Sequence, residues 1–175
     1  LVVYTSDHGL NCGHHGLWGK ANSTRPVNFL EESLRIPMIF AGWSELAVPQ
    51  VRPNFVDHTD LFATLVEIAG AEPPGDRDYP GRSFASMLTG GPAVHDWKRH
   101  QVSEYGDARM ARSATHKLIR RHGRAPDELY DLIAEPRETR NLIEDPAQRE
   151  RVAELDAALA EVFDPLADHP HNGLR

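Results

Sequence analysis

The sequence predicts an α/β unit over residues 1–92, followed by a small α+β unit over residues 93–175. Three observations carry this prediction. The chain opens on an unbroken apolar run, Leu1–Tyr4, which stops at a polar loop and is typical of a buried strand of a parallel sheet. The segment His58–Gly70 has the apolar spacing of a helix. After Pro92, four short strand-like segments precede a second amphipathic helix.

The first unit consists of short apolar segments joined by polar loops. A loop rich in Gly and His, Asp7–Ala21, follows the first strand. It lies at the carboxyl end of that strand, where open α/β sheets bind ligands. The other expected elements are a short helix or ordered loop over Val27–Leu34, a strand over 36–40, an extended piece over 54–57 and a short helix over 83–88.

The first long helix is predicted with both of its ends. Thr59 is expected to cap the N-terminus, and Gly70 is expected to follow the last turn. Asp60 adds a favourable negative charge to the first turn. The side chains that share the core-facing stripe are Leu61, Leu65 and Ile68.

The second unit is expected to be an antiparallel sheet of up to four strands with one helix. The clearest turns are Gly106-Asp107 and His122-Gly123. Pro146 stands at a natural starting position for the helix that ends near Phe163, and a frayed tail follows it. The four strand segments are 101–105, 109–113, 117–121 and 128–132.

Composition narrows the classes of partner. The net charge of −7 argues against nucleic acid or an anionic membrane as the main partner. No apolar run approaches the roughly 20 residues of a membrane span. The single cysteine, Cys12, excludes an internal disulfide and a Cys-based zinc cluster.

Asp7 and His8 are the first candidate pair for chemistry. They stand next to each other just past a buried strand, where both side chains can turn toward one ion. A carboxylate with an imidazole suits a divalent metal, with calcium, magnesium and manganese favoured by the carboxylate and transition metals by the imidazole. The alternative is structural: Asp7 caps the loop and His8 makes a local hydrogen bond.

Lys20 and His15 are the second candidate pair. A lysine held near a metal can bind one oxygen of a tetrahedral anion and stabilise negative charge in the transition state. His15 can bind the same anion or protonate a leaving group. The alternative is a solvated surface lysine and an ordinary loop histidine.

Two other interpretations of the loop are weaker. His8, His14 and His15 would be the ligands of a zinc site, but their spacing fits no zinc motif. Cys12 has no base placed beside it by the sequence, so we do not expect it to be a nucleophile.

Taken together, these residues resemble the C-terminal metal-and-sulfate loop of the sulfatase family, within the alkaline phosphatase superfamily. The likeness rests on TSDHGLNCGHHGLWGK, with its Ser-Asp-His-Gly, Gly-x-His-Gly and Trp-x-Lys pieces. It continues through EESLRIPMIF, DHTDLFATLVEIAG, GRSFASML and ELYDLIAEPRETRNLIEDP, and so covers nearly the whole chain. The fold it implies is the C-terminal portion of a mostly parallel alkaline-phosphatase-like sheet, followed by an antiparallel subdomain.

The resemblance implies a role for each candidate residue. Asp7 and His8 would be two ligands of a metal, usually calcium in sulfatases and often manganese in phosphonate-cleaving relatives, with magnesium also possible. Lys20 would bind the sulfate oxygens, and His15 lies at a position near the substrate. The substrate would be a small-molecule or saccharide sulfate ester, and the alternative is a phosphonate monoester or phosphodiester.

The resemblance also implies parts that this sequence does not contain. The family's nucleophile is a formylglycine made from a Cys/Ser-x-Pro/Ala-x-Arg motif, and no segment here matches that motif. We therefore expect the C-terminal part of a longer enzyme, inactive by itself and prone to associate through its uncovered sheet. The remaining interpretation is a non-catalytic remnant or an interaction module.

Overall fold

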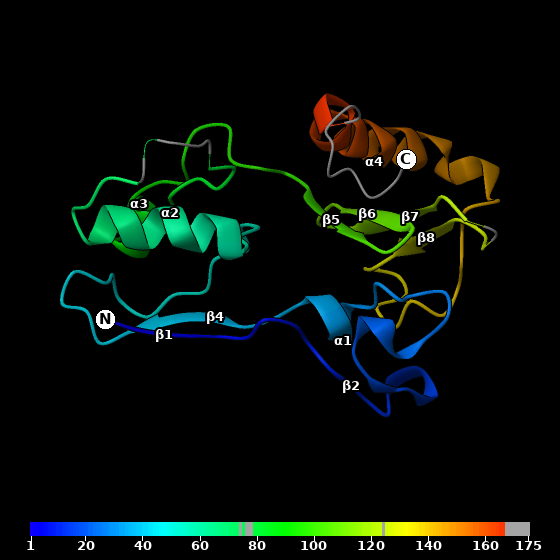
Figure 1. The fold of residues 1–175 in the computed structure, drawn as a ribbon, viewed down its shortest axis with the longest axis horizontal. Helices are drawn as coiled ribbons and strands as arrows, with labels where there is room; N and C mark the ends of the chain where they lie inside the picture. Colours follow the sequence, from blue (N-terminus) through cyan, green and yellow to red (C-terminus); the bar gives the residue numbers. More distant parts are fainter. Residues whose placement is uncertain (74, 76–78, 124, 167–175) are drawn as a thin grey trace. The chain divides into compact units, whose positions relative to one another are not determined.

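A computed structural model of the chain describes residues 1–73, 75, 79–123 and 125–166. It divides into two compact units, each made of two segments (Figure 1). The first unit holds residues 1–5 and 38–99, and the second holds residues 6–37 and 100–175. None of the helices described is long and apolar enough to cross a membrane.

The first unit pairs two strands and packs two helices with them. Strand β1 (Val2–Thr5) pairs with β4 (Met38–Ala41), with Val3 opposite Phe40. Helices α2 (His58–Ile68) and α3 (Ala85–Leu88) contact each other. The buried core of the unit consists of Phe84, Met87 and Trp97.

The pairing of β1 corrects one expectation. The apolar run predicted a parallel strand covered on both faces, whereas β1 and β4 are antiparallel. Val2 and Tyr4 are 63% and 64% exposed, so one face of this pair is open within the described chain. The physical reason is that an apolar run fits either pairing, since strand direction is set by the connection and not by the side chains.

Helix α2 begins one residue before its predicted cap. Asp57 is the N-cap: its carboxylate accepts from the backbone N–H groups of Thr59 and Asp60, and the Asp60 carboxylate accepts from the N–H of Asp57. The predicted role of Asp60 in the first turn is thus confirmed. Gly70 follows the helix with a positive φ of 61°, as expected. The predicted stripe is only partly correct, because Leu65 is 38% exposed.

The second unit contains the predicted four-stranded sheet. Strands β5 (Gln101–Tyr105), β6 (Ala108–Arg112), β7 (His116–Arg121) and β8 (Glu128–Asp131) are antiparallel neighbours in chain order. A 3-10 turn (Pro146–Gln148) leads into α4 (Arg149–Phe163), which covers one face of this sheet (Figure 1). A further 3-10 turn, Asp164–Leu166, follows; the rest of the expected tail lies outside the described residues.

The other face of the sheet is covered by a segment from early in the chain. This segment holds a short hairpin of β2 (Asn11–Cys12) and β3 (Trp18–Gly19), then α1 (Glu31–Leu34). The 3-10 turns His14–Gly16 and Ala21–Ser23 lie within and after the hairpin. Phe29 is buried against Ala108, Met110 and Ile119 of the sheet.

The unit boundaries therefore differ from the predicted division at residues 92 and 93. Residues 6–37 pack with the antiparallel sheet, and the change of unit falls after Arg99. Residues 6–37 contact the sheet through the Phe29 cluster and through a buried ionic contact that composition cannot reveal. Lys117, on β7, is 0% exposed and lies 2.7 Å from a carboxylate oxygen of Glu31 and 2.7 Å from one of Glu138.

The two carboxyl groups around Lys117 respond differently to burial. Burial raises the pKa of Glu31, but the charges and hydrogen bonds of Lys117 and Arg112 outweigh it and hold the pKa below the ordinary value. For Glu138, burial is the larger effect, and it raises the pKa even though Lys117 lowers it. The charges of Lys117 and Arg112 thus balance those of Glu31 and Glu138. The pKa values of the two carboxyl groups nevertheless shift in opposite directions.

Acid is expected to weaken the second unit through Glu31. Because the folded-state pKa of Glu31 lies below its ordinary 4.5, its stabilisation is complete above about pH 4.5 and is lost as the pH falls through the folded value. Glu31→Gln should remove this part of the acid sensitivity. The measurement is the fall in thermal midpoint of the whole protein between neutral pH and about pH 3.5.

Glu138→Gln is the matched control for this experiment. Its raised pKa makes a contribution of opposite sign, which is present at low pH and lost as the pH rises through the folded value. Replacing it should therefore leave the acid-side fall at least as large as in the wild type. An equal fall in the wild type and in Glu31→Gln would contradict the assignment.

Candidate functional site

Asp7, His8 and Lys20 meet at one place in the second unit. The Nε2 atom of His8 lies 3.5 Å from Oδ2 of Asp7 and 3.3 Å from Nζ of Lys20. Ser6 closes the turn, since its hydroxyl donates to the carbonyl of His8 at 2.8 Å. Residues twelve positions apart in the chain thus present a carboxylate, an imidazole and an ammonium to one point.

The hydrogen bonds of His8 determine which of its nitrogens carries the proton. Nδ1 lies 2.9 Å from the carbonyl of Gly9, and a carbonyl can only accept, so Nδ1–H is the donor. Lys20 can only donate, so Nε2 must offer it a lone pair. In the tautomer with the proton on Nδ1, the Nε2 lone pair of His8 faces the ammonium and lies beside the carboxylate of Asp7.

This arrangement fits a divalent cation. Metal-binding histidines commonly donate their second ring N–H to a backbone carbonyl, which orients the ring and raises its basicity, and Nδ1 of His8 does so here. Asp7 adds a largely exposed carboxylate 3.5 Å from the same nitrogen. Residues 1–73, 75, 79–123 and 125–166 contain no group of three or more His, Cys, Asp or Glu side chains suited to a metal. The described part of the chain thus offers two ligands, and the three-histidine zinc alternative finds no support.

Gly9 allows the loop to approach helix α1 closely. Its N–H donates to the carbonyl of Ser33 at 2.9 Å. A Cβ atom at this position would lie 2.0 Å from the carbonyl oxygen of Glu32, a backbone atom that cannot turn away. The residue after His8 must therefore be glycine for this loop to rest on α1.

A buried polar network holds the hairpin that carries Lys20. The side-chain amide of Asn11, which is fully buried, donates to the carbonyl of Gly19 at 3.2 Å and to Oγ of Ser33 at 2.8 Å. Ser33 in turn donates to the side chain of Asn28, which donates to the carbonyl of Ala21. Both residues that flank Lys20 are thus hydrogen-bonded through their carbonyl groups.

His15 is placed differently from the other three candidates. No hydrogen bond or ion pair joins it to Asp7, His8 or Lys20 among the residues the structure describes. Its Nε2 lies 4.0 Å from Oε2 of Glu32, a buried oxygen without a hydrogen-bond partner. Its φ of 53° places it in the left-handed region, which is uncommon for a residue with a side chain.

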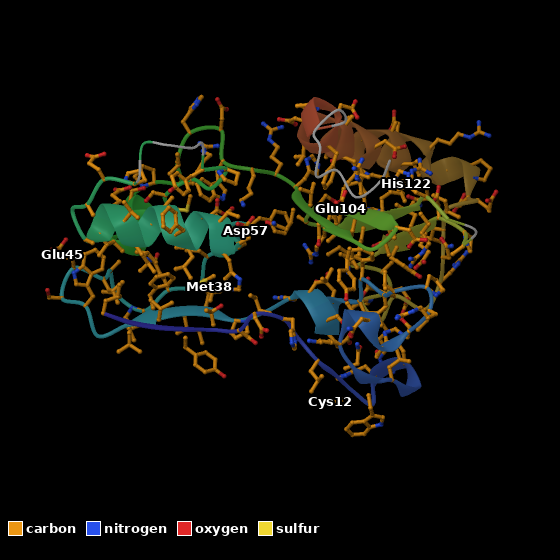
Figure 2. All side chains as sticks on the ribbon, viewed as in Figure 1. Cys12, Met38, Glu45, Asp57, Glu104 and His122 are labelled. Atoms are coloured by element: carbon orange, nitrogen blue, oxygen red, sulfur yellow. The ribbon has the colours of Figure 1, made fainter. Side chains whose placement is uncertain are left out.

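The remaining loop residues take no part in this cluster. Cys12 is a free, exposed thiol on the β2–β3 hairpin, where Figure 2 labels it. Sequence reasoning missed Asn11, Ser33 and Glu32, because Asn, Ser and Glu are common loop and helix residues. Only the proximity of α1 to the loop distinguishes them.

The chain matches a known family over most of its length. Residues 13–164 match the family described as N-sulphoglucosamine sulphohydrolase, C-terminal. The chain is similar to the Delta 4,5-hexuronate-2-O-sulfatase of Bacteroides thetaiotaomicron, with 31% identity over 174 residues, which cover 91% of this chain and 34% of that protein. It is also 29% identical over 169 residues to the multifunctional alkaline phosphatase superfamily protein PehA of Trinickia caryophylli, covering 84% of this chain and 31% of PehA.

Solved structures share the fold. BT4656, solved in complex with its substrate D-glucosamine-2-N,6-O-disulfate, matches with a TM-score of 0.79 at 26% identity, over 96% of this chain and 35% of that one. The phosphonate monoester hydrolase of Agrobacterium radiobacter, at 23% identity, matches with a TM-score of 0.78 over 94% of this chain and 35% of that one, which shows the fold alone.

These likenesses confirm the predicted fold class and the predicted resemblance. The chain spans about a third of the length of the curated relatives it matches. The family match covers β3, α1, both helices of the first unit and the antiparallel sheet with α4, and it begins at residue 13, after β2. The chain therefore belongs to the N-sulphoglucosamine sulphohydrolase C-terminal family, among the sulfatases of the alkaline phosphatase superfamily.

Proposed function

We propose that the protein carrying this chain is a metal-dependent hydrolase of sulfate esters. In this proposal Asp7 and His8 bind the metal, and Lys20 binds the sulfate oxygens. The observation that carries it is the position of His8 Nε2, 3.3 Å from the ammonium of Lys20 and 3.5 Å from the carboxylate of Asp7. An anion bound beside a cation at this point would meet a fixed positive charge.

Each side chain has a defined task. A bound metal, calcium in the first place and manganese or magnesium otherwise, would act as a Lewis acid on the ester's oxygens. Asp7 and His8 would hold it, and the Nδ1–H bond to Gly9 orients the imidazole so that Nε2 is the ligand atom. Lys20 stabilises the negative charge that grows on the sulfate oxygens in the transition state.

His15 is proposed to protonate the leaving alcohol. The carboxylate of Glu32, 4.0 Å from its Nε2, can orient the imidazole for such a step. The nucleophile of the family, a formylglycine, has no counterpart motif in this sequence. Residues 1–175 alone are therefore expected to show no turnover.

The relatives support a sulfated saccharide as the substrate class. A hexuronate-2-O-sulfatase and a structure holding a disulfated glucosamine are both among them. A phosphonate or phosphodiester substrate is the second candidate, favoured by the similarity to a protein named as multifunctional within the superfamily. Two 4-nitrophenyl esters, one a sulfate and the other a phosphonate, can distinguish these two substrate classes, because the esters differ only in the group that is transferred.

The test is hydrolysis by the whole protein after removal of metal by a chelator. 4-Nitrophenyl sulfate and 4-nitrophenyl phenylphosphonate are assayed before and after calcium, manganese or magnesium is returned. We expect sulfate hydrolysis to disappear with the metal and to return best with calcium. Preferential phosphonate hydrolysis would support the second candidate, and no hydrolysis of either ester would leave a non-catalytic module.

A further inference from the structure

We propose that the buried ammonium of Lys117 is a positioning group for the loop that carries Asp7, His8 and Lys20. It acts through helix α1, from the face of the antiparallel sheet opposite α4. The inference rests on the proposed function, since those three side chains form the proposed site. It assigns to the C-terminal sheet a part in the geometry of the site.

Lys117 fixes the start of α1 at two points. Its Nζ lies 2.7 Å from the carbonyl of Phe29 and 2.7 Å from Oε1 of Glu31, the first residue of the helix. Its third acceptor is Oε1 of Glu138, also at 2.7 Å. Three acceptors satisfy all three N–H groups of an ammonium that has no access to solvent.

Glu138 holds the same helix from its other oxygen. Oε2 accepts the backbone N–H of Glu31 at 2.8 Å, so one carboxylate bridges the ammonium and the first turn of α1. Glu138 is buried and has a φ of 53°, a left-handed conformation that is costly for a residue with a side chain. Glu138 keeps this conformation while both of its carboxylate oxygens accept hydrogen bonds. We therefore take its contact with α1 to be a specific feature of the fold.

Helix α1 transmits this placement to both halves of the proposed site. The carbonyl of Ser33 accepts from the N–H of Gly9, the residue after His8. The hydroxyl of Ser33 accepts from Asn11, whose amide also holds the carbonyl of Gly19, the residue before Lys20. Ser33 thus holds Gly9 directly and Gly19 through Asn11, and these two backbone positions adjoin the proposed metal ligand and the proposed anion-binding lysine. A shift of the helix must move both.

The test compares Lys117→Met with Arg120→Met in the whole protein. Arg120 lies on the same strand, but its ion pairs join the sheet to Asp127 and to Asp156 of α4, away from α1. Both variants lose one cation and its ion pairs. Each is assayed well below its own thermal midpoint, so that only folded protein contributes to the signal.

Two readouts follow the position of the loop. The first is hydrogen exchange of the Gly9 amide, which we expect to be about 10-fold faster in Lys117→Met and unchanged in Arg120→Met. The second is kcat/KM for 4-nitrophenyl sulfate, expected to fall by about 10- to 100-fold through kcat in Lys117→Met only, since small misplacements cost this much. A loss of stability without displacement would leave kcat of the folded protein unchanged and would speed exchange of the sheet amides along with that of Gly9, so only acceleration beyond that of the sheet amides indicates displacement.

Glu138→Gln keeps the test decisive if Lys117→Met does not fold. It preserves the shape of the side chain and removes one charge. We expect faster exchange of the Gly9 amide and a lower kcat, each changed by a smaller factor than in Lys117→Met. Unchanged Gly9 exchange and unchanged kcat in a folded variant would overturn the proposal. If the wild type hydrolyses no sulfate ester, the proposed function fails, whereas the exchange readout still decides whether Lys117 positions the loop.

Discussion

Lys20→Met is expected to lower kcat/KM for sulfate ester hydrolysis by the whole protein by about 10²- to 10³-fold, or roughly 3–4 kcal/mol of transition-state stabilisation. The methionine keeps the length and the apolar part of the side chain but loses the ammonium 3.3 Å from His8. The charge acts on the transition state, so the loss should appear mainly in kcat. Steady-state kinetics with 4-nitrophenyl sulfate at saturating metal measures it.

Arg35→Met is the matched control for that variant. Arg35 is an exposed cation in the same unit, immediately after α1. Its removal changes the net charge by the same amount and leaves the cluster of Asp7, His8 and Lys20 intact. Equal losses of activity in the two variants would mean that Lys20 contributes only to the general field of the protein.

Asp60→Ala is expected to weaken helix α2 by about 3 kcal/mol, since it removes a buried carboxylate that serves several donors at once. The Asp60 carboxylate is 2% exposed and lies 2.5 Å from Nζ of Lys98. It also accepts the backbone N–H groups of Arg82 and Asp57, so two further donors lose their acceptor. Figure 2 labels Asp57 at the beginning of α2, the end that this group holds.

Hydrogen exchange of the α2 amides in the whole protein measures that loss, and about 3 kcal/mol corresponds to roughly 10²-fold faster exchange. Glu67→Ala is the matched control, because Glu67 is an exposed carboxylate in the last turn of the same helix. It should change exchange little. Similar acceleration in both variants would show that Asp60 contributes no more than a surface charge.

Predictions from local pattern agree closely with the structure for elements that pack through their own periodicity. The four strands of the C-terminal sheet begin and end within one residue of the predicted bounds, and α4 ends at Phe163 as expected. Alternation and helical spacing specify which side of an element is apolar, and turns such as Gly106 mark its ends. Neither the periodicity nor the turn residues depend on which element packs against the helix or strand.

Predictions that depend on the partner were less accurate. Leu1–Tyr4 was expected in a parallel sheet, and β1 instead pairs with β4 in the antiparallel sense. The cap of α2 was expected at Thr59, but Asp57 caps the helix because its carboxylate can accept from two N–H groups at once. In each case the local pattern allowed more than one arrangement, and the surrounding structure selected one of them.

By itself, the sequence determined the fold class, the family and the candidates Asp7, His8, His15 and Lys20, because the spacing of these residues around glycines is encoded locally. Only the tertiary structure decided that Lys20 adjoins His8, that His15 pairs with Glu32, and that residues 6–37 pack on the C-terminal sheet. The physical reason is that these contacts join residues that are far apart in the chain, and the packing of residues 6–37 on the sheet includes a buried Lys117, a residue whose type predicts a solvated surface. Its burial is stable only because Glu31, Glu138 and Phe29, distant in the chain, converge on one ammonium.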